Sequence, residues 1–265
     1  MSDKVMIGGV PVDVYSRDSL ADQLARDVTA PLARPKLVFS ANGQGISMAV
    51  TDQVFARDLE QADIVHADGM SIVFASRVFT RTHLPERIAT TDFFHDAARV
   101  ADKKRLKFFF LGAKEEVVRD AYAEAQKMYP NVDWVGFRNG YFTEDEEEQV
   151  CREIVATGAD VVWVGIGRPK QEAFCVRNAD RLAGVTWLKT CGGLFDFLAG
   201  RNSRAPSWMQ SLGLEWAYRT LLEPRRLLWR YVVTNTHCLW LFLTKSGSIT
   251  PAAPHDTPLS ASGER

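Results

Sequence analysis

The most informative stretch of this sequence is Asp160-Val-Val-Trp-Val-Gly-Ile-Gly-Arg-Pro-Lys-Gln-Glu172, an apolar run followed by a glycine-rich turn. A short apolar run bounded by turn residues is typical of a buried strand, and the turn leads into a helical pattern. The same succession recurs along residues 1 to 200. Because alternating strands and helices build a parallel sheet covered by helices, the sequence predicts a doubly wound α/β core.

Six apolar runs are predicted strands: Lys36–Ser40, Asp63–His66, Lys107–Leu111, Val132–Gly136, Asp160–Val164 and Val185–Lys189. A hairpin is expected where Val5–Ile7 and Val10–Val14 flank Gly8-Gly9, because glycines adopt the positive φ of a tight turn. Helical periodicity covers Ser19–Val28, Glu115–Met128 and Glu144–Ala156, the last with Thr143 as N-cap.

The chain has 265 residues, of which 46% are hydrophobic and 25% charged, enough for one large core with a small addition. We expect three parts: an α/β core over residues 1–204, a C-terminal helical appendage over 205–245 with its second helix beginning at Pro224, and a flexible Ser/Pro/Ala-rich tail over 246–265.

Charge is unevenly distributed along this chain. Residues 201–245 carry seven Lys or Arg residues against two acidic ones and four of the seven tryptophans, which favours a surface that meets anionic and partly apolar headgroups. Its apolar stretch Tyr231–Leu243 is too short to span a bilayer, and no secretory signal is visible. We therefore expect a cytoplasmic protein, peripheral on the inner face of the cytoplasmic membrane. Four scattered cysteines indicate neither a zinc site nor disulfides.

Five loops after predicted strands carry the small and polar residues from which a ligand site is built in open α/β sheets. They are residues 40–44, 67–69, 111–113, 165–172 and 191–196. Their glycines, among them Gly112 and Gly167, allow backbone N–H groups to approach a ligand, and each loop precedes a predicted helix whose N-terminus favours phosphate. A nucleoside diphosphate is the expected ligand. The P-loop and dinucleotide fingerprints are missing, which argues against an ATPase or an NAD dehydrogenase.

Individual polar residues leave alternatives open. Asp68 ends a strand, where it could act as a general base or cap the following helix. Asp196 could bond a ligand or its own backbone turn, and Arg87 could bind an anion or stay solvated. Lys170 and Gln171 follow Pro169, which is the predicted start of a helix. At a helix N-terminus they could contact a diphosphate, or Lys170 could be a solvated surface charge.

The order of these motifs resembles the WecG/TagA/CpsF glycosyltransferases, family 26. The resemblance spans residues 5 to 230 and rests on a series of short motifs: Asn42, Ala67-Asp-Gly69, Leu84-Pro-Glu-Arg87, Phe110-Leu-Gly112, Gly140-Tyr-Phe142, Gly165-x-Gly-x-Pro-Lys-Gln-Glu172, Gly192-Gly-x-Phe-Asp196, Arg204-Ala-Pro206 and Gly213-Leu-Glu-Trp-x-Tyr-Arg219.

Members of this family transfer a sugar from a UDP-sugar to a polyprenyl-pyrophosphate-linked saccharide, with inversion, in surface polysaccharide or teichoic acid synthesis. The resemblance implies a Rossmann-like parallel sheet core with helices on both faces and a membrane-associating C-terminal helical appendage. The expected donor sugar is N-acetylmannosamine, its uronic acid or glucose.

The resemblance also implies roles for single residues. It makes Asp68 the catalytic base, gives Gln171 a role at the donor diphosphate or sugar, and sets Tyr141 and Asp196 near the uridine. Ser40 stands where the family commonly has threonine, so the strand-end hydroxyl is retained. Ser40 and Arg87 join Asp68 as candidate catalytic residues, with Arg87 at the departing diphosphate. The remaining candidate substrate-binding residues are Asn42, Gly112, Gly167 and Lys170.

For the acceptor pyrophosphate we expect Arg219, Arg226 and Arg230, because guanidinium groups grip phosphate oxygens through paired hydrogen bonds. The basic helix face could equally be solvated or form a subunit contact in a homo-oligomer. No cofactor or metal is expected, since the chain has no Asp-x-Asp motif. The alternatives are a non-catalytic nucleotide-sugar binding or regulatory protein and a nucleic-acid-binding module. Nucleic acid is not an expected partner, because only the appendage is basic.

Overall fold

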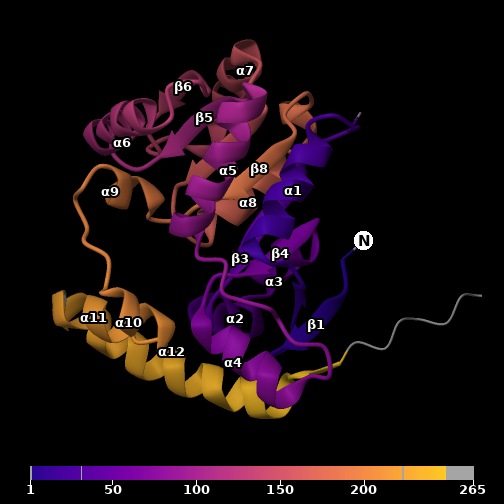
Figure 1. Ribbon diagram of the computed structural model, residues 1–265, viewed down its shortest axis with the longest axis vertical. Helices are drawn as coiled ribbons and strands as arrows, with labels where there is room; N and C mark the ends of the chain where they lie inside the picture. Colours follow the sequence, from indigo (N-terminus) through magenta and orange to yellow (C-terminus); the bar gives the residue numbers. More distant parts are fainter. Residues whose placement is uncertain (1, 31, 223, 249–265) are drawn as a thin grey trace, which may run out of the picture.

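The computed structural model describes residues 2–30, 32–222 and 224–248, which form a mixed α/β molecule (Figure 1). Its main sheet is parallel throughout, in the order β4-β3-β8-β7-β5-β6. The strands are β3 (Lys36–Ala41), β4 (Ile64–Ala67), β5 (Lys107–Gly112), β6 (Asp133–Arg138), β7 (Val161–Gly165) and β8 (Trp187–Thr190). All six predicted strands are confirmed, with ends moved by one or two residues.

Helices cover both faces of this sheet, as the apolar character of its strands requires. One face carries α2 (Gly43–Thr51), α3 (Gln53–Glu60), α4 (Met70–Phe79), α7 (Glu147–Thr157) and α8 (Lys170–Asn178). The opposite face carries α1 (Arg17–Asp27), α5 (Thr90–Lys104), α6 (Glu115–Met128) and α9 (Leu194–Leu198). Neighbouring strand residues alternate between the two cores: Phe109 and Leu111 pack beneath the first set, Phe108 and Phe110 beneath the second. The predicted doubly wound α/β fold is confirmed.

The predicted helices are also present. Helix α6 has the predicted ends, and α1 begins two residues earlier than expected. The segment predicted from Glu144 begins as a 3-10 turn, η1 (Glu144–Glu146), before α7. Thr143 is its N-cap and forms a capping box with Glu146. A second 3-10 turn, η2 (Asp180–Leu182), follows α8.

The N-terminal hairpin is confirmed as well. Strands β1 (Lys4–Ile7) and β2 (Val10–Asp13) are antiparallel, and both Gly8 and Gly9 adopt positive φ. A short strand, β9 (Gly247–Ser248), pairs with β1. Residues 247–248 of the tail expected over 246–265 are thus paired with β1, and residues 249–265 lie outside the described part of the chain.

Three helices follow the core: α10 (Ser207–Ser211), α11 (Glu215–Leu222) and α12 (Pro224–Lys245). Helix α12 begins at Pro224 as predicted, and α10 is an additional short helix. Figure 1 shows α12 running beneath α2 and α4. Its residues Cys238, Leu241 and Phe242 are buried in the same core as the β1–β2 hairpin. Among the described residues, none of the helices is both long and apolar enough to cross a membrane.

Candidate active site

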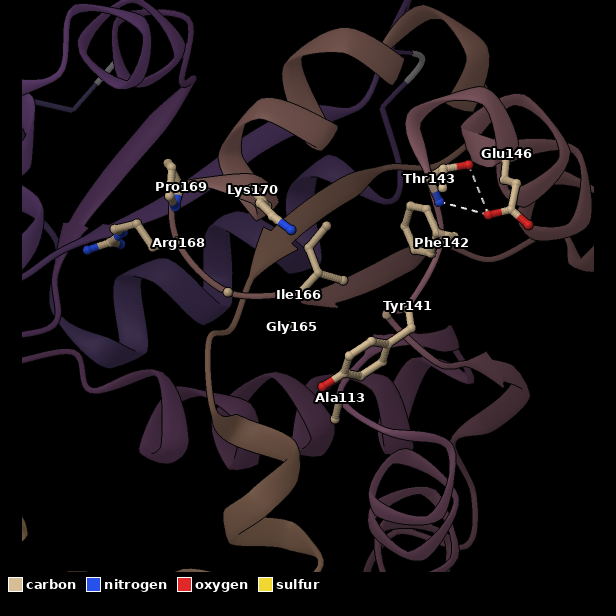
Figure 2. Close-up of a pocket in the computed structure, with 12 residues that line it drawn as sticks. Ala113, Tyr141, Phe142, Thr143, Glu146, Gly165, Ile166, Arg168, Pro169 and Lys170 are labelled. Carbon is tan, nitrogen blue, oxygen red and sulfur yellow. Dashed lines mark hydrogen bonds between the residues drawn. The ribbon is translucent and has the colours of Figure 1, made fainter. Parts of the chain in front are cut away.

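A cavity of about 700 Å³ opens at the carboxyl ends of β5, β6 and β7 (Figure 2). Open parallel sheets bind ligands at this edge, and the volume lies within the usual range for small-molecule sites. Three loops supply the lining: Ala113 after β5, Gly140–Thr143 and Glu146 after β6, and Gly165–Lys170 after β7.

Two of the candidate glycines have distinct structural reasons to be glycine. At Gly112, φ is +150° and a Cβ would lie 2.3 Å from the carbonyl oxygen of Gly165, so β5 and β7 can approach closely only without a side chain. At Gly167, φ is +86° and a Cβ would meet nothing within 4 Å. Gly167 therefore borders the open cavity, whereas Gly112 allows β5 and β7 to pack closely beneath it.

Two candidate side chains, Lys170 and Tyr141, border the cavity and are exposed to solvent. Lys170 is the first residue of α8, and in Figure 2 its side chain lies among the lining residues. No ion pair of Lys170 occurs in the described part of the chain. Its ammonium group and the N-terminus of α8 together give this side of the cavity a positive potential, which suits an anionic ligand.

Arg168 connects the cavity to the ends of neighbouring strands. Its guanidinium donates to the carbonyl oxygen of Ser40 (2.6 Å), to Oδ1 of Asn42 (3.1 Å) and to Oε1 of Glu172 (3.0 Å). It also lies over the ring of Phe55, 5.6 Å from the centroid. The sequence prediction did not single out Arg168, although it lies inside the glycine-rich loop.

Asp68 lies at the end of β4, and both its carboxylate oxygens accept hydrogen bonds. Oδ1 accepts from the backbone N–H of Thr90 (2.8 Å), the first residue of α5, and Oδ2 accepts from Nδ2 of Asn42 (3.4 Å). The helix that directly follows, α4, has Gly69 as its N-cap. Asp68 therefore bonds the start of α5 and does not cap α4, and its carboxylate remains half-exposed.

Asn42 is the N-cap of α2, because its Oδ1 accepts from the backbone N–H of Gly45 (3.0 Å). The same oxygen accepts from Arg168, while Nδ2 faces Asp68. One amide thus joins the carboxylate of Asp68 to the loop that lines the cavity. Asp68 is thus brought beside Asn42, 26 residues away in the sequence, and Arg168 joins Asn42 to Ser40.

Gln171 is buried beneath the cavity. Its Oε1 accepts from the backbone N–H of Gly192 (3.1 Å), and its Nε2 donates to Oε1 of Glu172 (2.9 Å). Both ends of the amide are therefore bonded within the protein. Gln171 holds the turn after β8 in place, and Asp196 follows that turn in the first turn of α9.

Arg87 lies away from the cavity lining, in contact with the C-terminal helices. Its Nη1 is 3.0 Å from Oε2 of Glu215 at the start of α11, and its Nη2 is 4.0 Å from Asp92 of α5. Arg204 pairs with Asp92 as well. Burial opposes ionisation of Asp92, but these arginines outweigh it and hold the pKa of its carboxyl below the ordinary value.

Two further buried polar residues lie close to this edge of the sheet, and the sequence prediction did not include them. His66 and Lys189 are fully buried. Burial lowers the pKa of His66 well below its ordinary value and lowers that of Lys189 to about 8. A lysine at the end of the apolar run 185–189 was the available signal. The thiol of Cys191 is also buried, which raises its pKa and leaves it protonated.

The three arginines expected at the acceptor pyrophosphate belong to α11 and α12. Arg219 is in α11, and Arg226 and Arg230 are in the first turns of α12. Their side chains lie outside what the structure describes. Within the described residues, no three metal-ligating side chains gather as a possible metal site.

Comparison with known proteins assigns the chain to a family. A sequence model of the WecG/TagA/CpsF family of glycosyl transferases matches residues 5–250. The chain belongs to this family. A Bacillus subtilis (strain 168) protein named N-acetylglucosaminyldiphosphoundecaprenol N-acetyl-beta-D-mannosaminyltransferase is 33% identical over 190 residues, which cover 72% of this chain and 73% of the relative. Membership of this family identifies the chain as a glycosyltransferase.

Proposed function

We propose that this glycosyltransferase moves a sugar from a UDP-sugar to a saccharide linked to polyprenyl pyrophosphate, with inversion at the anomeric carbon. The observation that carries the proposal is the link from the Asp68 carboxylate through Asn42 and Arg168 to the cavity after β7. That link sets a candidate base beside a candidate donor site.

The donor would occupy the cavity. Lys170 and the start of α8 would face the diphosphate, because helix N–H groups and an ammonium group favour anions. Gly167 would leave room for the diphosphate to approach the backbone. Tyr141, which lines the cavity, and Asp196, in the first turn of α9, would border the nucleoside. Gly112 and Gln171 would not contact the donor but would fix the conformation of the loops around the cavity.

Asp68 would act as general base on the acceptor hydroxyl. The hydroxyl passes its proton to the carboxylate, its oxygen bonds to the anomeric carbon opposite the diphosphate, and the bond from that carbon to the diphosphate oxygen breaks with its electron pair leaving on UDP. Thr90 and Asn42 would hold the carboxylate in orientation, while Ser40 and Arg168 would position Asn42.

The appendage would bring in the acceptor. Exposed apolar side chains share one side of α12 at helical spacing, Trp229, Val232, Trp240 and Leu243 among them, which suits the headgroup boundary of a membrane. Arg219, Arg226 and Arg230 would bind the lipid pyrophosphate. Arg87 would contribute through Glu215, by holding α11 against the core, in place of the direct contact with the leaving group that the sequence suggested.

The name of the Bacillus relative favours N-acetylmannosamine as donor sugar and an N-acetylglucosaminyl lipid as acceptor. A panel of UDP-sugars, comprising N-acetylmannosamine, its uronic acid and glucose, is offered with a short-chain lipid pyrophosphate acceptor, and products are scored by mass. We expect one donor to give a product, and NMR should show that the configuration at its anomeric carbon is inverted. A chain that binds UDP-sugars but forms no product with the lipid pyrophosphate acceptor would refute the proposed transfer to a lipid-linked saccharide.

The same assay tests the base. Asp68→Asn keeps an oxygen for the Thr90 N–H but cannot take up the proton, so kcat should fall by about 10²- to 10⁴-fold with UDP affinity nearly unchanged. The exposed Asp180→Asn, on η2, is the matched control and should retain full activity. A kcat for Asp68→Asn within twofold of wild type, with chemistry rate-limiting, would exclude Asp68 as the base.

A further inference from the structure

Glu172 is a fully buried carboxylate in the first turn of α8. Its Oε1 accepts hydrogen bonds from Nε of Arg168 (3.0 Å) and from Nε2 of Gln171 (2.9 Å). Its Oε2, also buried, has no hydrogen-bond partner among the described residues. Taking a carboxylate out of water is costly, and an apolar residue would often serve stability as well as a buried ion pair. The other bonds of Arg168 show what the pair holds in place.

The guanidinium of Arg168 spans from Glu172 to the end of β3 and the start of α2. Glu172 binds its Nε, while Nη2 donates to the carbonyl oxygen of Ser40 (2.6 Å) and Nη1 to Oδ1 of Asn42 (3.1 Å). The side chain is only 10% exposed, and in Figure 2 its guanidinium points away from Lys170. Because the donors of a planar guanidinium have fixed directions, a bond at Nε sets where both Nη groups can reach. Glu172 thus sets the direction in which Arg168 meets Asn42.

The side-chain amide of Asn42 can lie in two orientations, and its neighbours select one. Oδ1 accepts from the backbone N–H of Gly45 (3.0 Å) and from Arg168, so Nδ2 faces Oδ2 of Asp68 (3.4 Å). In the flipped orientation the amide NH₂ would meet two donors, and the amide oxygen would meet the carboxylate, which also only accepts. Gly45 and Arg168 together therefore hold the amide N–H of Asn42 towards Asp68.

Gly45, in the first turn of α2, leaves the space that this arrangement needs. A Cβ at this position would lie 2.5 Å from Nη1 of Arg168 and 3.3 Å from its Cζ. A side chain there would push the guanidinium away from Asn42. Glycine is a poor helix former, so alanine would otherwise suit the position better. Two residues of different helices, Gly45 and Glu172, thus serve the placement of one guanidinium.

We propose that Glu172 is a positioning residue for the proposed transfer: its buried carboxylate fixes the guanidinium of Arg168, and Arg168 holds the Asn42 amide with its N–H towards Asp68. The inference rests on the proposed role of Asp68 as base. Glu172 acts through three hydrogen bonds in series and needs no contact with either substrate. Because Arg168 belongs to the loop that lines the cavity, the same bonds tie the orientation of the carboxylate to the donor site.

Gly45→Ala tests the arrangement without removing any charge, and alanine suits a helix, so the variant should fold. The added methyl group should displace the guanidinium of Arg168, so kcat should fall about tenfold while UDP affinity stays within about twofold of wild type. In an Arg168→Met background, Gly45→Ala should have no further effect on kcat, because no guanidinium is left to displace. An unchanged kcat in Gly45→Ala, or the same loss in both backgrounds, would overturn the inference.

Substitutions at Glu172 test its carboxylate directly. Glu172→Leu removes the acceptor of Arg168, whereas Glu172→Gln keeps an oxygen for Arg168 and Gln171 and puts its NH₂ at the unpartnered position of Oε2. We expect kcat to fall about tenfold in Glu172→Leu and to recover to within about threefold of wild type in Glu172→Gln, with UDP affinity unchanged in both. A wild-type kcat in folded Glu172→Leu would overturn the inference.

Glu147 of α7 provides the matched control. It is a buried carboxylate that likewise accepts hydrogen bonds from an arginine and an amide, here Arg177 and Asn178. Glu147→Leu should lower the melting temperature and leave kcat unchanged. A loss of kcat in Glu147→Leu equal to that in Glu172→Leu would show that burial of a carboxylate on this side of the sheet matters only for the fold, and would overturn the inference.

The possible outcomes separate the two proposals. A wild-type kcat in Gly45→Ala and in Glu172→Leu overturns the inference and leaves the proposed transfer standing. Full activity of Asp68→Asn overturns the role of Asp68 as base, whatever the Glu172 variants do. Should Glu172→Leu fail to fold, the double variant Arg168→Met with Glu172→Leu leaves neither charge unpaired and should show the same loss of kcat. A wild-type kcat in that double variant would overturn the inference.

Discussion

The guanidinium of Arg87 lies 3.0 Å from the carboxylate of Glu215, and this pair joins the loop before α5 to the first turn of α11. Both side chains are mostly buried, with 12% and 23% of their surface exposed. Ion pairs at such partly buried positions are less screened than surface pairs. The contact ties the C-terminal helices to the sheet that carries Asp68.

A double-mutant cycle should measure this tie. Arg87→Met and Glu215→Gln should each lower the free energy of unfolding, and their effects should be non-additive by about 0.5–3 kcal/mol. Urea unfolding gives the stabilities, and the transfer assay gives the activities. Additive effects on stability would show that the pair contributes no specific interaction. In the transfer assay, an Arg87→Met variant far less active than Glu215→Gln would indicate a direct role of Arg87 at the diphosphate.

Gln171→Ala should lower the stability of the fold and should not remove a direct contact with the ligand. The substitution leaves the Gly192 N–H without its acceptor and removes one of the two hydrogen bonds to Oε1 of Glu172, which should lower the free energy of unfolding by about 1–3 kcal/mol. Thermal unfolding and calorimetry with UDP would be run on the same preparation. Weaker UDP binding with an unchanged melting temperature would instead place the amide at the donor.

Charged substitutions on the exposed face of α12 should detach the protein from membranes. Deleting the helix would uncover the core around Leu241 and Phe242, so we choose Trp229→Glu, Trp240→Glu and Leu243→Glu together. We expect UDP binding to persist, while sedimentation with anionic vesicles and transfer to a long-chain acceptor fall at least about tenfold. The matched control carries glutamate at three exposed apolar residues of the α/β domain, Val54, Met128 and Val155. Unchanged vesicle binding would remove α12 from the membrane contact.

His66 should make the fold sensitive to acid. The folded protein holds the pKa of His66 well below that of an unfolded chain, so below about pH 6.5 the unfolded state takes up a proton that the folded state does not. The free energy of unfolding should therefore fall as pH drops, with a limiting slope of about 1.4 kcal/mol per unit from this group. His66→Phe should have a shallower pH dependence in urea unfolding between pH 7 and 5. Equal slopes would contradict a neutral buried imidazole.

Lys189 should make the free energy of unfolding depend on pH in the alkaline range. Its folded pKa of about 8 is below the ordinary 10.5, so between these values the unfolded state binds more protons and the free energy of unfolding rises with pH. Lys189→Met should be more stable than wild type at pH 7 by about 3 kcal/mol, an advantage that shrinks as pH approaches 10. Urea unfolding at pH 7 and 9.5 measures both. A constant difference would show that the variant acts through packing alone.

The sequence by itself determined the local elements of this protein. Apolar runs fixed six strands, helical periodicity fixed α1, α6 and α7, and Pro224 marked the start of α12, because each of these signals depends on neighbouring residues. The sequence also put Asp68 at the end of a strand, and the carboxyl ends of parallel strands share one edge of the sheet.

Only the tertiary structure decided which side chains meet at that edge. Arg168 bonds Ser40 and Asn42 across 128 and 126 residues of chain, and the amide of Gln171 turns inward to Gly192. Strand order brings β8 beside β3, which buries Lys189 on the Asp68 side of the sheet. Such contacts depend on how distant segments pack and on what burial does to a charge, and the local pattern of residues carries neither kind of information.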